Sequence, residues 1–144
     1  MNPEILDFLN TQRVSALAIE MLDGSPHVAT VHFTHTENPF LFYFETYREY
    51  RKAEALFGRD ASRASLVIGF GESVMKTFQL DGEVRLLRDD EREHFDSVYF
   101  QKFPERKEKS KDPKFVCFVF EPKWWRYTDW TKPTGKFVLT SKTQ

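Results

Sequence analysis

Apolar runs that suit β-strands recur along most of this chain, and aromatic side chains fill many of them. The sequence contains 15 Phe, 5 Tyr and 3 Trp in 144 residues. Aromatic residues are enriched in strands, and their rings bury large apolar areas. The pattern therefore favours a β-rich core, or an interface that buries large rings. The strand-like runs are 14–21, 27–35, 40–45, 65–70, 74–87, 114–121 and 136–140.

Three segments with helical spacing interrupt these strands. Residues 3–11 carry an apolar side, residues 47–57 stop at Gly58, and residues 88–103 begin with three acidic residues and end before Pro104. Gly82 interrupts the run 74–87 and predicts a β-bulge or a close backbone approach. Because strands dominate, the sequence predicts one α+β domain over residues 1–144, built on an antiparallel barrel or a strongly bent sheet.

Composition narrows the class of function. The formal net charge is -1, which gives no electrostatic support for binding nucleic acid or an acidic membrane. No apolar stretch approaches the ~20 residues of a membrane-spanning helix, and the N-terminus has no basic-then-apolar signal. The single Cys117 lies in an apolar run and is expected to be a buried thiol in a reducing compartment. These features predict a cytoplasmic protein with neither a nucleic-acid partner nor a membrane partner.

The segment from Phe40 to Lys52 carries the clearest functional signal. A hydrophobic strand runs out through Thr46, and the helix that follows brings two adjacent cations, Arg51 and Lys52. A hydroxyl, backbone N–H groups near a helix start and fixed positive charge can together hold a phosphate. The alternative interpretation places Arg51 and Lys52 on a solvated helix face.

Two other groups of residues suggest other ligands. His32 and His35 point to opposite faces of a strand, so the histidines lack the geometry of a metal site, and we expect none. One axial histidine could still bind haem iron. The aromatic segment 124–130 lies beside cations, an arrangement on which bases stack in nucleic-acid binders. The near-neutral charge and strand context favour interface packing for this segment.

In the order of its elements and in several local motifs, the chain resembles the flavin-binding split-barrel superfamily of pyridoxamine 5′-phosphate oxidase. The motifs are the hairpin DGSPHVATVHF, the strand-to-helix segment FYFETYREYRKAEAL, the strand TFQLDGEVRLL and the helix end FQKFP. It is similar to short bacterial members of this superfamily. The resemblance implies a six-stranded antiparallel split β-barrel with peripheral helices, a homodimer, and FMN bound in a groove between the subunits.

The resemblance also assigns residues to the cofactor site. The strand-end threonine corresponds to Thr46, and the Arg-Lys pair that holds the flavin phosphate corresponds to Arg51 and Lys52. Glu45, Tyr50 and Ala29 stand where the family often has tyrosine, serine and arginine. The hairpin strand around Thr30, Val31 and His32 is expected to approach the flavin ring with its backbone. A polar residue, Thr77 or Gln79, is expected to face the ring from another strand. Trp125 and Arg126 are expected to contact the flavin bound by the partner subunit.

The implied activity is redox chemistry, because the flavin itself exchanges a hydride with a small organic substrate. We therefore expect an FMN-dependent oxidoreductase. Three alternatives remain open: a protein that binds flavin or haem without catalysis, such as a carrier or sensor; a barrel that uses another flavin or a deazaflavin; and a cofactor-free structural dimer. The catalytic residues, the substrate and the electron acceptor are not assigned by the sequence.

Overall fold

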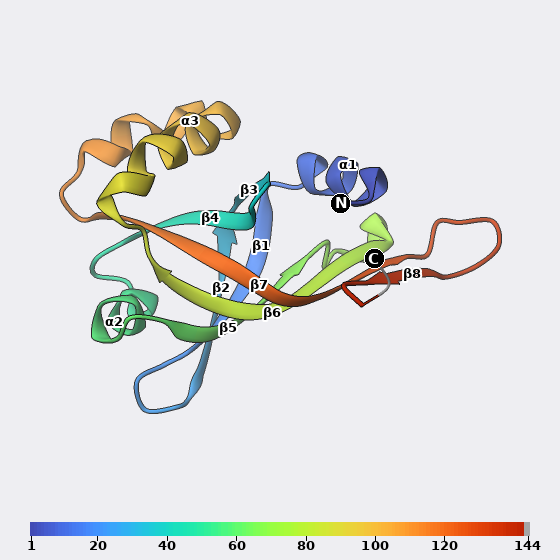
Figure 1. Ribbon diagram of the computed structural model, residues 1–144, viewed down its shortest axis with the longest axis horizontal. Coiled ribbons are helices and arrows are strands. Elements are labelled where there is room, and N and C mark those ends of the chain that lie inside the picture. Colours follow the sequence, from blue (N-terminus) through green and yellow to red (C-terminus); the bar gives the residue numbers. More distant parts are fainter. Residues whose placement is uncertain (143–144) are drawn as a thin grey trace.

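A computed structural model describes residues 1–142 as a curled antiparallel sheet with helices at its periphery (Figure 1). The strand order is β2-β1-β5-β6-β7-β4-β3, and β8 pairs with β7. The strands are β1 (Val14–Glu20), β2 (Pro26–His32), β3 (Thr34–Glu37), β4 (Phe40–Tyr47), β5 (Ser62–Ile68), β6 (Lys76–Leu86), β7 (Phe115–Asp129) and β8 (Phe137–Thr140). The helices are α1 (Pro3–Thr11), α2 (Arg51–Gly58) and α3 (Arg92–Lys102), with short 3₁₀ turns η1 (Glu72–Val74), η2 (Asp89–Glu91), η3 (Pro104–Arg106) and η4 (Glu108–Lys111).

The sheet curls because β2 and β3 lie at opposite ends of the strand order yet are separated only by Phe33. β2 pairs with β1, and β3 pairs with β4. Counted as one bent strand, they complete six barrel strands, and β8 adds a short hairpin. The α+β split-barrel class predicted from the sequence is thus confirmed.

The break at Phe33 differs from the continuous alternation expected for residues 27–35. Phe33 and Thr34 are both buried, at 0% and 6% exposure, so the period of two fails there. The Phe33 ring packs 6.0 Å from that of Phe42, and its N–H donates to the Arg13 carbonyl. Core packing of this one ring therefore bends the strand.

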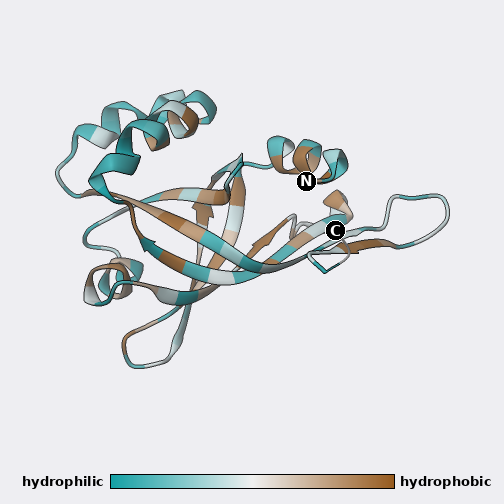
Figure 2. Cartoon of the chain, viewed as in Figure 1, coloured by the Kyte–Doolittle hydropathy of each residue, from teal (hydrophilic) through white to brown (hydrophobic). Residues whose placement is uncertain are grey.

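Aromatic side chains fill two cores on opposite faces of β4. Inside the barrel, Phe44 stacks on Phe118 with ring centroids 5.1 Å apart. On the other face, Tyr43 packs beneath α3, where Phe95 and Tyr99 stack at 4.8 Å. Figure 2 shows the strongly hydrophobic residues mainly on strands, while α3 is largely hydrophilic. Because both faces of β4 are covered, its sequence is a continuous apolar run.

The bulge predicted at Gly82 is confirmed, since the pairing of β6 with β7 shifts register between Asp81 and Gly82. A Cβ at Gly82 would lie 2.1 Å from the Glu121 carbonyl oxygen. Gly82 also faces Pro122, which has no N–H to donate. The bulge therefore allows a proline within a central strand, and β7 continues to Asp129 instead of ending at Glu121 as expected.

Residues 105–113, expected to form a mobile loop, contain the η3 and η4 turns instead, and Arg106 of η3 forms an ion pair with Glu45 of β4. Across residues 1–142, no helix combines the length and apolar character needed to cross a bilayer.

Candidate flavin site

The junction between β4 and α2 places the two predicted phosphate-binding cations differently. α2 begins at Arg51, with Tyr50 as its N-cap residue. Arg51 is exposed to solvent, whereas Lys52 is buried at 8% exposure. Within residues 1–142, neither side chain forms an ion pair, and the Lys52 Nζ lies 5.0 Å above the Tyr50 ring. Burial lowers the pKa of Lys52, and the negative charge of Glu45 partly opposes that shift.

Thr46, the third residue of this predicted group, points into the barrel. It is 2% exposed and pairs with Val116, a core residue of β7. Its Oγ1 atom finds no hydrogen-bond partner among the described residues. A buried hydroxyl without a partner is unfavourable, so a ligand oxygen that reached it would relieve that cost.

Glu45 and Arg106 form an ion pair beside this junction that the sequence analysis did not predict. Their side chains are 5% and 17% exposed, and the Arg106 Nε atom is buried without a partner in the described chain. Glu45 stands where the family often has tyrosine, so Arg106 neutralises the carboxylate that this chain introduces. Only the charged composition of residues 105–113 could have indicated such a partner, without its identity.

His32 lies close to this ion pair, at the end of β2. Its ring is 5.0 Å from that of Phe103. Burial lowers the pKa of His32, the positive charges of Arg106 and Arg13 lower it further, and the charges of Glu45 and Glu105 oppose the shift. The imidazole is therefore mainly neutral at pH 7 and can offer a nitrogen lone pair to a ligand.

β2 forms one end of the strand order, and half of its backbone groups face away from β1. The Phe33 N–H donates a hydrogen bond to the Arg13 carbonyl of the chain leading into β1. In an antiparallel pair, residues that exchange backbone hydrogen bonds alternate with residues that do not, so Val31 bonds to β1 and its neighbours in β2 do not. The backbone groups of Thr30 and His32 consequently face away from β1, while those of Val31 face toward it. The Val31 side chain is buried in the core. Backbone contact with a flavin ring, as the resemblance implies, is thus available from Thr30 and His32.

The other predicted residues lie on the barrel's outer face, with one exception. Thr30, Ala16, Val67, Gln79 and Arg126 form one row of directly paired positions across five strands. Gln79 lies between the buried residues 78 and 80, which fixes its outward direction. Within the described residues the Arg126 Nε atom is buried without a hydrogen-bond partner.

Two further predicted residues border this row. Thr77 shares the face of Gln79, two residues away on β6, and is half-buried. Trp125 instead points into the core, where its ring lies 5.5 Å from that of Phe78. The structure therefore offers both Thr77 and Gln79 as outer-face contacts, whereas the Trp125 ring is not available on that face.

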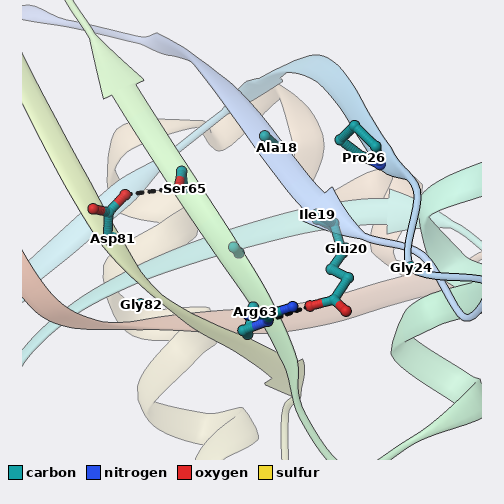
Figure 3. Close-up of a pocket in the computed structure, with 10 residues that line it drawn as sticks. Ala18, Ile19, Glu20, Gly24, Pro26, Arg63, Ser65, Asp81 and Gly82 are labelled. Atoms are coloured by element: carbon teal, nitrogen blue, oxygen red, sulfur yellow. Dashed lines mark hydrogen bonds and ion pairs between the residues drawn. The ribbon is translucent and has the colours of Figure 1, made fainter.

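The same outer face carries two adjoining cavities. One, of about 360 Å³, is lined by Gln79, Val28 and Trp124 among others. The other, of about 410 Å³, is shown in Figure 3, where Ser65 donates to Asp81 at 2.7 Å and Arg63 pairs with Glu20. Both carboxylates are hydrogen-bonded, and Ala18, Ile19 and Pro26 give the lining its apolar surface. No group of three or more His, Cys, Asp or Glu in residues 1–142 is arranged to hold a metal ion.

Comparison with known proteins identifies the family of this chain. The family model described as pyridoxamine 5′-phosphate oxidase matches residues 1–129. The chain belongs to the pyridoxamine 5′-phosphate oxidase family. The membership inferred from the motifs is therefore confirmed. A search of curated proteins finds no match.

Several solved structures share the fold of this pyridoxamine 5′-phosphate oxidase family member. The conserved hypothetical protein Rv2991 from Mycobacterium tuberculosis is 21% identical, with a TM-score of 0.69 over 90% of this chain and 85% of that one. A heme-binding protein from Mycobacterium smegmatis is 12% identical, with a TM-score of 0.71, and this chain spans 99% of its own length but 60% of that protein. HutZ, a heme storage protein from Vibrio cholerae, is 18% identical, with a TM-score of 0.67 over 85% of this chain and 89% of that one. At these identities the comparisons establish the fold alone.

Proposed function

We propose that this chain binds FMN and acts as a homodimeric, cytoplasmic flavin-dependent oxidoreductase on a small organic substrate. The observation that carries the proposal is Lys52, a cation 8% exposed that forms no ion pair within the described residues. Burial of its side chain lowers the pKa of Lys52, and the nearby Glu45 carboxylate is already paired with Arg106, so the ammonium has no counter-ion of its own. A ligand phosphate at the β4–α2 junction would supply the missing charge.

The residues around Lys52 suit a phosphate. Arg51, exposed on the first turn of α2, offers a guanidinium fork, and Lys52 offers a point charge. Glu45 would repel a phosphate, but its ion pair with Arg106 reduces that repulsion. The unpartnered Thr46 hydroxyl needs an acceptor or a donor that a ligand could provide.

A bound flavin would supply the hydride or electron transfer, and the chain would bind and orient it. The outer-face row offers the Gln79 amide and the Arg126 guanidinium as hydrogen-bond donors for the polar edge of the ring. The β2 edge offers backbone groups of Thr30 and His32. The row and the junction lie on different parts of the barrel, so two copies of the chain, each contributing one of them, are proposed to form each complete site.

The test compares FMN with riboflavin, which has the same ring system but no phosphate. We expect purified protein to show a flavin spectrum, and mass spectrometry of the released cofactor to identify FMN. Added FMN should raise the melting temperature of the apoprotein, because a ligand specific for the folded state stabilises it by mass action. Failure to bind flavin, or equal affinities for FMN and riboflavin by calorimetry, would overturn the proposal.

Haem binding is a second candidate, and His32 is the observation that favours it. A half-buried neutral imidazole beside the Phe103 ring is suited to axial ligation of haem iron. The structural neighbours include one heme-binding and one heme storage protein. In this case haemin added to the apoprotein would give a Soret band that shifts in His32→Ala. The exposed His94→Ala should serve as the matched control and leave the band unchanged.

A further inference from the structure

A third cavity, of about 490 Å³, lies where the end of β6, the start of β7, α2 and the η2–α3 segment meet. None of its lining residues belongs to the predicted flavin site. Apolar side chains form much of its wall, among them Phe57 from α2, Leu87 after β6 and Phe115 from β7. Its size falls within the range of roughly 300–1,000 Å³ typical of small-molecule sites.

Three arginines line this cavity, and they differ in how far their charge is compensated. Arg92 pairs with Asp96 at 2.7 Å, and Arg88 lies 3.7 Å from Glu91. Arg48 forms no ion pair with any residue from 1 to 142. The lining includes one carboxylate, that of Asp89. The cavity therefore combines an apolar wall with one arginine, Arg48, that forms no ion pair, while the Asp89 carboxylate offsets one positive charge of the lining.

The orientation of Arg48 leaves it able to bind an anion. Its guanidinium carbon lies 3.9 Å from the centroid of the Phe57 ring. Stacking of this kind uses the flat face of the guanidinium and leaves its N–H edges free for a planar anion. The ring also restricts the side chain before any ligand arrives, which reduces the entropy lost on binding.

We propose that this cavity binds an organic monocarboxylate with an apolar chain or ring. The carboxylate would pair with Arg48, and the apolar body would lie against Phe57, Leu87 and Phe115. A monoanion matches the single arginine of the lining that forms no ion pair, whereas a doubly charged phosphate would leave excess negative charge beside Asp89. The proposal is independent of the flavin function, because the two sites share no residue.

Cys117 provides an internal reporter for this cavity, because it lines the wall and is the single cysteine of the sequence. Burial raises the pKa of its thiol to about 12; the positive charge of Arg92 opposes that shift, and the negative charge of Asp96 adds to it. The thiol therefore reacts only slowly at neutral pH, and its rate of labelling depends on access through the cavity. A ligand in the cavity should shield it further from a small thiol reagent.

The test uses decanoate as the probe, with decanol and decyltrimethylammonium as neutral and cationic controls of the same chain length. Calorimetry on the full chain should show decanoate binding that weakens at least ~10-fold in Arg48→Gln, because a charge-assisted contact is lost. Arg48 is exposed, so this variant should keep the wild-type melting temperature. Arg63→Gln, an exposed arginine at a different cavity, is the matched control and should bind normally.

Labelling of Cys117 by methyl methanethiosulfonate gives a second readout. Decanoate should slow labelling of the wild-type protein and of Arg63→Gln, and should do so much less in Arg48→Gln. Both measurements are repeated with saturating FMN. The proposal would be overturned if decanoate bound Arg48→Gln as tightly as the wild type, or if decyltrimethylammonium bound as tightly as decanoate. It would also be overturned if decanoate left the labelling rate unchanged or competed with FMN.

Discussion

At the scale of single residues, the candidate site depends on which of its charges are paired before any ligand binds. Lys52 is buried without an ion pair in the described part of the chain, while Glu45 and Arg106 satisfy each other. Buried charges are costly unless paired. The structure therefore separates a cation that needs a partner, Lys52, from a carboxylate that already has one, Glu45.

The phosphate assignment leads to the first prediction. Replacing both Arg51 and Lys52 with Ala should weaken FMN binding by about 3 kcal/mol, because two charge-assisted contacts are lost. Riboflavin binding, without a phosphate, should change little. Calorimetry with both flavins measures the difference, and the exposed pair Lys107→Ala/Lys109→Ala is the control. Unchanged FMN affinity would place the phosphate elsewhere.

The Glu45–Arg106 pair leads to the second prediction. Glu45→Gln should lower the free energy of unfolding by about 3 kcal/mol, because Arg106 is left largely buried without its counter-ion. The same variant should bind FMN more tightly, since a carboxylate near Lys52 is removed. Urea denaturation and calorimetry measure the two effects.

A double-mutant cycle tests whether the effect comes from this pair. Glu45→Gln/Arg106→Gln should be less destabilised than the sum of the two single variants, since neither charge then remains unpaired. Additive destabilisation would show that the two side chains do not interact energetically.

Residue-level prediction from the sequence was strongest where a motif is local. Arg51, Lys52 and Thr46 lie on one short segment, so the sequence could group them. Arg106 is 61 positions from Glu45 and lies in a segment that reads as a solvated connection. A contact of that kind depends on how α3 packs against β3 and β4, which no local pattern encodes.

At the scale of elements, the glycine bulge in β6 decides how two long strands pair. Gly82→Ala should lower the free energy of unfolding by more than ~2 kcal/mol, because the new Cβ would lie 2.1 Å from the Glu121 carbonyl oxygen. Gly24→Ala is the comparison: its φ of +84° is unfavourable for alanine, but nothing lies within 4 Å of the added carbon. It should cost only about 1–2 kcal/mol. Equal effects in urea denaturation would contradict the bulge argument.

The elements that the sequence misplaced share a physical cause. The helix 3–11 and the bulge at Gly82 were predicted because capping, periodicity and glycine are local signals. The break at Phe33 and the extension of β7 past Pro122 were missed, because core packing of one ring and a bulge on the neighbouring strand decide them. Tertiary context overrides strand periodicity at both places.

At the scale of the whole molecule, buried basic groups should make stability depend on pH. Burial, together with the positive charge of Lys102, lowers the pKa of His35 to about 4. The unfolded chain therefore binds more protons than the folded chain between pH 4 and the ordinary histidine pKa of about 6.5. The contribution of His35 to the free energy of unfolding should consequently fall as pH decreases through this interval and level off below about pH 4.

A second basic group, Lys102, follows the same rule at higher pH. Burial lowers the pKa of Lys102 to about 8, with Arg13 adding to the shift. Its contribution to stability should rise between pH 8 and the ordinary lysine pKa of about 10.4. Melting temperatures measured across both ranges test the two signs. His35→Gln should reduce the fall in melting temperature between about pH 6.5 and pH 4, whereas the exposed His94→Gln should leave it unchanged. An unchanged fall in His35→Gln would show that other groups cause it.

The arrangement of the proposed site over two copies leads to the last prediction. The variant Arg51→Ala/Lys52→Ala lacks the junction, and Gln79→Ala/Arg126→Ala lacks the outer-face donors. If each flavin site takes the junction from one subunit and the row from its partner, each homodimer binds FMN weakly. A mixed dimer then has one intact site and one site without either group. Random mixing of equal amounts should thus restore about a quarter of the high-affinity sites. A site contained within one subunit would gain no intact copy on mixing, so calorimetry of the refolded mixture distinguishes the two arrangements.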